Sequence, residues 1–264
     1  MNELYYDSRK LLIYLAIKYK GDYEQMLDAM ILKDVNAPYE EVMKVCNSLP
    51  CKAITFLDYD YPERLKQMQR PPLVLFYYGD ISLLDKKSIA VVGSRNYSNY
   101  GRRVTERVIA AIIKGKVVIS GLAKGIDAIA HRAAIDNGGR TIAVLGSGID
   151  YCYPSENRAL YEEIKKNHLL VSEYPFDMTP DREHFPLRNR IVVGLSDAIL
   201  IPQINSYMSG TMISLNLALQ LNKEVFVAPH PLGSEAINNS LLNEGATLIE
   251  SKEQLLRDLG WSES

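Results

Sequence analysis

Four short apolar runs, each followed by small residues, constrain the fold of this 264-residue chain more than any other feature. The runs cover residues 89–92, 116–119, 141–145 and 198–201, and the small residues lie at 93–94, 120–121, 146–148 and 209–211. Runs of this kind are typical of buried strands in a parallel sheet. Their loops then emerge at one edge, the carboxyl ends of the strands, where α/β folds bind ligands.

Strands and helices are expected to alternate from residue 87 onward. Helical spacing of apolar residues predicts helices over about 104–112, 128–134, 160–164 and 213–221, and further strands are expected at 169–172, 197–201 and 224–228. This alternation predicts an α/β protein with a mostly parallel sheet and helices on both faces. An apolar fraction of 47% is enough for a substantial core.

The first 51 residues differ from the remainder, because they contain only short helical patterns. Leu11, Leu12, Leu15 and Tyr19 lie at helical spacing before Gly21, and shorter apolar faces follow near 26–30 and 42–46. We therefore expect a small helical domain over residues 1–51 and a second domain over 52–264.

The loops after the predicted strands have the residue types of an anion site. Gly93-Ser94-Arg95 combines backbone amides and a hydroxyl with a guanidinium that suits phosphate, although a tight turn with a surface arginine has the same sequence. Lys124 lies between Gly121 and Gly125 at an expected helix start, where it can add charge to the site. Ser209-Gly210-Thr211 offers a further helix start.

Two carboxylate interactions are left open by the pattern. Asp127 is four residues before His131 on one predicted helix, so it can either contact that histidine or accept from nearby amides. Arg188-Asn189-Arg190 should place at least one guanidinium at a buried, ligand-facing helix start. A buried salt bridge to Glu173 is the competing explanation, and both can hold at once.

Positive charge is concentrated in the middle of the chain. Residues 86–140 contain eleven Lys or Arg and three acids, a local charge of +8, whereas the net charge of −2 leaves −10 for the remainder. Such asymmetry is expected when one face meets a polyanion, and solvated helix faces are the alternative. Tyr153, beside Pro154 and Asn157, is a candidate for stacking on a base while the asparagine contacts the backbone.

Several function classes are disfavoured. Cys46, Cys51 and Cys152 have no metal-ligand spacing and are expected to be free thiols in a reducing compartment. No nucleophile–base set, Walker lysine motif or G-x-G-x-x-G sequence is present, and no cofactor is expected. The apolar run at 11–17 is too short to cross a bilayer, so a cytoplasmic protein without membrane contact is predicted.

Taken together, these motifs resemble the DNA-processing protein A family (DprA, also called Smf). The resemblance runs from about Tyr61 to about Ile249 and includes the segments at 91–95, 120–127, 130–131, 138–146, 153–154, 172–173 and 185–190. It implies an extended Rossmann-like domain after a small SAM-like helical domain, and no winged-helix domain at the carboxyl end. It also implies that the protein is a homodimer and not an enzyme. The implied function is to bind and protect single-stranded DNA and to load a RecA-type recombinase onto it during natural transformation.

The resemblance and the loop chemistry together give a set of candidate site residues. The family's phosphate-binding arginine corresponds to Arg95, and the complete phosphate-binding set is Gly93, Ser94, Arg95, Gly121, Lys124, Asn157, Arg188, Asn189, Gly210 and Thr211. Family resemblance alone suggests Ile237, Leu241 and Leu242 as dimer contacts. The chain departs from the family pattern at Gln203, where an acid is usual, at His230, and over 236–242.

The alternative function is a nucleotide-binding enzyme related to the lysine-decarboxylase-like phosphoribohydrolases. That group uses a P-G-G-x-G-T-x-x-E motif, and aligning Gly210-Thr211 with it places Ser214 where the glutamate would be. A serine cannot replace a carboxylate as the acid or base. The enzyme hypothesis is therefore weaker than the DNA-binding one.

Overall fold

The computed structural model describes residues 7–32 and 38–261, and within them nine strands form one sheet. The strand order is β1-β2-β6-β5-β4-β3-β7-β8-β9. The strands are β1 (Lys52–Thr55), β2 (Val74–Gly79), β3 (Ser88–Val91), β4 (Val117–Ser120), β5 (Arg140–Leu145), β6 (Leu169–Ser172), β7 (Ala198–Ile201), β8 (Val225–Val227) and β9 (Thr247–Leu248).

Helices separate most of these strands. They are α1 (Ser8–Lys18), α2 (Tyr23–Ile31), α3 (Tyr39–Asn47), α4 (Glu63–Lys66), α5 (Asn99–Ile112), α6 (Ile126–Asp136), α7 (Arg158–Asn167), α8 (His184–Leu195), α9 (Gly210–Gln220), α10 (Asn238–Asn243) and α11 (Lys252–Asp258), with 3-10 turns η1 (Ile81–Asp85) and η2 (Ser155–Asn157). Side-chain caps help to define several starts: Ser98 accepts from the Gly101 amide at the start of α5, and Asp22 accepts from Gln25 at the start of α2.

The sheet is mostly parallel, as predicted. Strands β6, β5, β4, β3, β7, β8 and β9 pair in parallel, whereas β2 pairs antiparallel with both β6 and β1. The four runs singled out in the sequence are β3, β4, β5 and β7, so their carboxyl ends do share one edge. Strands β1 and β9 were not predicted, because Lys52–Thr55 contains only two apolar residues and Thr247–Leu248 only one, which leaves no apolar run to recognise.

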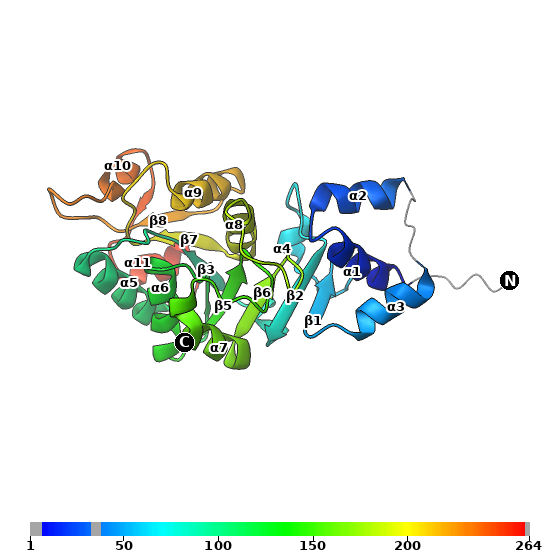
Figure 1. Cartoon of the computed structure of the whole chain (residues 1–264). Coiled ribbons are helices and arrows are strands. Elements are labelled where there is room, and N and C mark those ends of the chain that lie inside the picture. Colours follow the sequence, from blue (N-terminus) through cyan, green and yellow to red (C-terminus); the bar gives the residue numbers. More distant parts are fainter. Residues whose placement is uncertain (1–6, 33–37, 262–264) are drawn as a thin grey trace.

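Both faces of the sheet are covered by helices (Figure 1), and successive strand residues alternate between the two faces. On one face Ala90 and Ile199 pack with α8 and α9 residues such as Ile191 and Leu215. On the other face Ile89, Val91 and Leu200 join α5, α6 and α11. This two-sided burial explains why the central strands are continuously apolar.

The three amino-terminal helices lie at the β1–β2 end of the sheet (Figure 1). Leu12 and Leu15 of α1, Met26 of α2 and Val42 of α3 share a buried cluster with sheet and α7 residues, among them Phe76, Leu170 and Tyr161. The helical segment predicted before residue 52 therefore packs directly on the sheet. Part of it, residues 1–6 and 33–37, lies outside the described residues.

Candidate functional site

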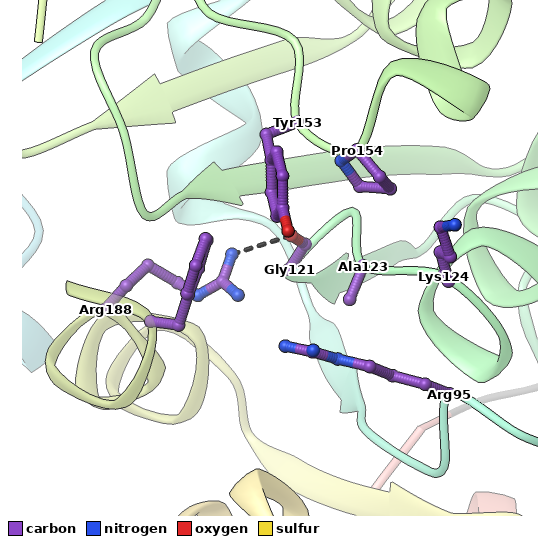
Figure 2. Close-up of a pocket in the computed structure, with 8 residues that line it drawn as sticks. Arg95, Gly121, Ala123, Lys124, Tyr153, Pro154 and Arg188 are labelled. Carbon is purple, nitrogen blue, oxygen red and sulfur yellow. Dashed lines mark hydrogen bonds between the residues drawn. The ribbon is translucent and has the colours of Figure 1, made fainter. Parts of the chain in front are cut away.

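The loops after β3, β4, β5 and β7 surround a cleft of about 780 Å³ at the carboxyl edge of the sheet. A smaller pocket of about 70 Å³ adjoins it (Figure 2). Residues that line both are Arg95, Ala123, Tyr153, Phe185 and Arg188. Of the ten predicted phosphate-binding residues, nine line at least one of these two cavities: Gly93, Ser94, Arg95, Gly121, Lys124, Arg188, Asn189, Gly210 and Thr211.

The loop after β3 presents Arg95 to both cavities because its other residues are tied down. The Ser94 amide donates to the Gln203 carbonyl (2.9 Å), and Ser94 Oγ accepts from the Asn205 amide (3.0 Å). A Cβ atom on Gly93 would lie 2.7 Å from Ile126, so glycine allows α6 to start directly behind the loop. Ser94 thus holds the loop, while the exposed Arg95 carries its charge.

The loop after β4 is arranged around Asp127. This buried carboxylate accepts from the amides of Gly121 (3.2 Å) and Ala123 (3.4 Å), so those amides are not free for a ligand. His131 instead contacts Thr141 through its Nδ1 atom (2.5 Å). Of the two roles considered for Asp127, the structure therefore has the one in which it accepts from nearby amides and not the contact with His131. Burial raises the pKa of Asp127 and lowers that of His131 to about 3, which keeps the imidazole neutral.

Arg188 is a buried cation at the base of the cleft. Its side chain extends from α8 and donates from Nη1 to the carbonyl of Gly121 (2.7 Å; Figure 2) and to that of Val144. Burial lowers its pKa to about 10, so the guanidinium stays charged at neutral pH. Any side chain on Gly121 would overlap this guanidinium, which explains the glycine. Arg188 therefore braces the β4 loop and also supplies charge.

The second arginine of the triplet has a different role. Arg190 pairs with Glu173 at 2.5 Å, and both side chains are largely buried. The salt bridge and the ligand-facing guanidinium therefore both exist, the first on Arg190 and the second on Arg188. The triplet does not start a helix as predicted, because α8 already begins at His184. Asn189 donates to the Gly210 carbonyl (3.2 Å) and thereby links α8 to the start of α9.

The segment after β5 closes one end of the cleft. Tyr153, about half exposed, stacks on Phe185 with ring centroids 5.4 Å apart. Asn157 donates to the carbonyls of Leu122 (2.9 Å) and Ala123 (3.3 Å), so it holds the β4 loop and lies outside the two cavities. Lys124 forms an ion pair with Glu156 at the rim.

The other end of the cleft is the start of α9, which contributes no charge. Ser209, Gly210 and Thr211 line it, and the first turn of the helix contains no acidic residue. Thr211 is 6% exposed. Amides at the start of an eleven-residue helix attract anions, so this end can bind phosphate through its backbone.

Sequence patterns do not identify several of the residues that line the cleft. Arg182, Asn205, Met208 and Ile213 line the cavity but follow no strand directly or carry no anion-binding signal. Phe185 belonged to a recognised motif, yet its stacking on Tyr153 depends on two segments that are distant in the chain. Only the fold brings these residues together.

The predicted dimer contacts lie elsewhere, around α10. Leu241 is 2% exposed and belongs to the core of the protein, with Ile237 and Leu242 packed partly buried against it. A core position leaves Leu241 little surface to offer a partner.

The positive segment at 86–140 does not gather at the cleft. Of its eleven Lys and Arg residues, only Arg95 and Lys124 line either cavity. Others are engaged elsewhere: Arg132 pairs with Glu163 at 2.7 Å, Arg102 pairs with Glu106 at 2.8 Å, and Lys116 is buried beside the Trp261 ring. Solvated helix faces thus account for much of the excess of positive charge over residues 86–140.

Two further properties of the described residues bear on function. They contain no grouping of three or more His, Cys, Asp or Glu suited to a metal ion. None of their helices has the length and apolar character needed to span a bilayer.

Comparison with known proteins gives a consistent assignment. The sequence model described as DNA recombination-mediator protein A matches residues 52–260. The DNA processing protein DprA of Streptococcus pneumoniae is 39% identical over 208 residues, which cover 78% of this chain and 73% of that protein.

Solved structures agree with it. The crystal structure of DNA processing protein A from S. pneumoniae superposes with a TM-score of 0.79 at 32% identity, covering 97% of this chain and 94% of that one. The protein from Helicobacter pylori, whose structure is described as giving insight into its single-stranded DNA binding mode, has a TM-score of 0.72 at 32% identity over 80% of this chain and 96% of that one. The extended Rossmann-like fold is thereby confirmed.

Proposed function

Because this chain belongs to the DNA recombination-mediator protein A family, we propose that it binds single-stranded DNA in the cleft at the carboxyl edge of its sheet. The observation that carries the proposal is the convergence of Arg95, Lys124 and Arg188 on one small pocket beside the cleft (Figure 2). The single-stranded DNA binding described for the H. pylori relative supports it.

The chemistry of the cleft suits a phosphate backbone more than a particular base sequence. Arginine and lysine neutralise phosphates and release counterions, so binding should weaken steeply with salt and depend little on sequence. The stacked pair of Tyr153 and Phe185 offers an aromatic surface to an unpaired base. A duplex would keep its base faces stacked inside and could not use that surface.

Fluorescence anisotropy with labelled oligonucleotides tests this proposal. Wild type should bind a single strand in preference to the duplex of the same sequence, and Arg95→Ala should weaken binding about tenfold or more at low salt. Arg107→Ala is the matched control, because that exposed arginine lies on α5 and lines neither cavity. Equal binding by wild type and Arg95→Ala across a salt titration would refute the assignment.

We further propose that the bound strand is protected and passed to a RecA-type recombinase, as the description of the family as a recombination mediator suggests. Recombinase filaments should form faster on strands coated with a separate single-strand-binding protein when this chain is added than when it is absent. We also propose a homodimer, which light scattering at micromolar concentration tests.

Catalysis is not part of the proposal. Of the described residues that line the two cavities, Asp127 alone carries a carboxylate, and it accepts from two backbone amides. Ser214 hydrogen-bonds the Gly210 carbonyl (3.3 Å) within α9. Incubation with nucleoside monophosphates should therefore release no free base, and release of base would support the phosphoribohydrolase alternative.

A further inference from the structure

The end of the cleft formed by the loop before α9 and the first turns of α9 exposes apolar side chains beside the charged site. Met208 is 99% exposed and Ile213 is 38% exposed, and both line the cleft. A contiguous exposed apolar patch rimmed by polar residues marks a surface for a ligand. Neighbouring Tyr207 differs, because its hydroxyl lies 3.4 Å from the Glu244 carboxylate and its side chain does not line the cavity.

The loop that carries Met208 is fixed to the phosphate side of the cleft. The backbone amide of Asn205 donates to Ser94 Oγ (3.0 Å), and its side-chain amide donates to the Asn96 carbonyl (2.9 Å). The buried Gln203 side chain donates to Asn205 Oδ1 (2.8 Å) and accepts from Ser98 at 2.9 Å. The β3 and β7 loops are thus joined by side-chain hydrogen bonds, which set the position of the apolar residues relative to Arg95.

Local geometry also holds Met208 outward. The Met208 amide donates to Ser206 Oγ (3.1 Å), and α9 begins directly afterwards at Gly210. The thioether therefore extends from a short loop with fixed ends and does not cover a core cluster. A methionine in this setting offers a flexible, polarisable surface that suits a flat ring.

Strand order places this surface opposite the aromatic pair. Along the sheet edge the loops follow in the order β5, β4, β3 and β7, so Tyr153 lies at one end, Arg95 near the middle and Met208 at the other end. Three strand spacings separate β5 from β7, about 14 Å. The cleft thus has a cationic centre between two surfaces suited to rings.

We propose that Met208 and Ile213 form a second base platform, which takes the unpaired bases of a strand whose phosphates bind at Arg95. This inference rests on the proposed function and extends it, because it assigns the bases as well as the phosphates. In a single strand the base faces are free for such contacts, whereas a duplex buries them. The platform therefore contributes to preference for single strands.

The test compares two probes of equal length, a labelled thymidine oligonucleotide and a labelled abasic oligonucleotide that retains every phosphate. The double variant Met208→Ser/Ile213→Thr should bind the thymidine strand about three- to tenfold more weakly than wild type, with an unchanged salt slope. On the abasic strand it should match wild type. Lys124→Ala should weaken binding to both probes.

Two controls keep the result interpretable. Leu32→Ser removes a side chain that is 73% exposed on the amino-terminal helical segment and should change neither affinity. Met208→Ser alone, in an exposed loop, should retain the wild-type thermal midpoint and show the same probe dependence more weakly.

An equal loss on both probes, or no loss on the thymidine strand, would overturn the platform. Wild type that bound neither probe would overturn the proposed function together with the platform. Wild type that bound both probes, with the double variant equal to it on each, would overturn the platform alone.

Discussion

The two ends of the cleft offer different groups to an anion. At the β4–β5 end the charge comes from Lys124 and Arg188, and the buried guanidinium also supports the Gly121 carbonyl. At the β7–α9 end Gly210 and Thr211 contribute helix-start amides and a hydroxyl but no charge. Removing the buried Arg188 guanidinium should therefore disturb the fold, whereas Gly210 at the other end can be altered with little effect on it.

The largest effect should follow removal of the buried guanidinium. Arg188→Met leaves the Gly121 and Val144 carbonyls without their donor and Asp127 buried without a neighbouring charge. The free energy of unfolding should fall by about 3 kcal/mol or more. Asn189→Ala, one residue along α8, loses the hydrogen bond to the Gly210 carbonyl and the one accepted from Arg188 Nε (3.3 Å), and should cost about 1 kcal/mol. Urea denaturation measures both, and equal losses would contradict the comparison.

A glycine pair sharpens the same contrast. Gly121→Ala should destabilise the protein by about 2–3 kcal/mol, because the new methyl group overlaps the Arg188 guanidinium. Gly210→Ala should leave stability unchanged or slightly higher, since the nearest atom to its Cβ would be Asn189 Nδ2 at 3.8 Å. Thermal unfolding measures the stability of both variants. A loss of stability in Gly210→Ala as large as that in Gly121→Ala would show that the α9 end is as tightly packed as the β4 end.

Salt dependence should separate the charged end from the uncharged one. Lys124→Ala should reduce the slope of log affinity against log salt by about 1. Thr211→Val keeps the side-chain shape but removes a hydroxyl, so affinity should fall by about threefold with the slope unchanged. Anisotropy titrations at several salt concentrations test this, and a changed slope for Thr211→Val would mean that its effect is electrostatic.

The smallest effect concerns the ion pair at the rim. Glu156→Gln should raise oligonucleotide affinity by about two- to threefold, because it frees Lys124 from an exposed partner. Glu162→Gln removes the same charge from a similarly exposed pair with Arg158 on α7, outside both cavities, and should have less effect. An equal gain in both variants would attribute the change to net charge alone.

The same contrast explains what could be predicted from the sequence. The parallel edge and its loops were predictable, because continuous apolar runs followed by glycine directly report buried strands and tight turns. Gly93 and Gly121 lie in such turns, where a side chain would clash with Ile126 or Arg188, and Arg95 is the cation beside Gly93 in the sequence. The residue pattern also indicated the triplet at 188–190, and the resemblance to a known family selected Arg188 and Asn189 within it.

What could not be predicted depends on contacts between distant segments. No local pattern shows that the Gly121 and Ala123 amides are taken by Asp127, or that Asn157 supports the β4 loop from outside the cavity. The two arginines of the triplet have identical chemistry, and only their places on α8 send one to the cleft and the other to Glu173. Met208 gave no signal, since a lone methionine before a helix has no pattern.

The most direct test of the central claim is a crystal structure of the protein with a short single-stranded oligonucleotide. Phosphate oxygens should lie within hydrogen-bonding distance of Arg95 and of the Thr211 amide, with bases toward Tyr153 at one end and Met208 at the other. A strand bound instead along the exposed arginines of α5, with the cleft at the carboxyl edge of the sheet left free, would contradict it.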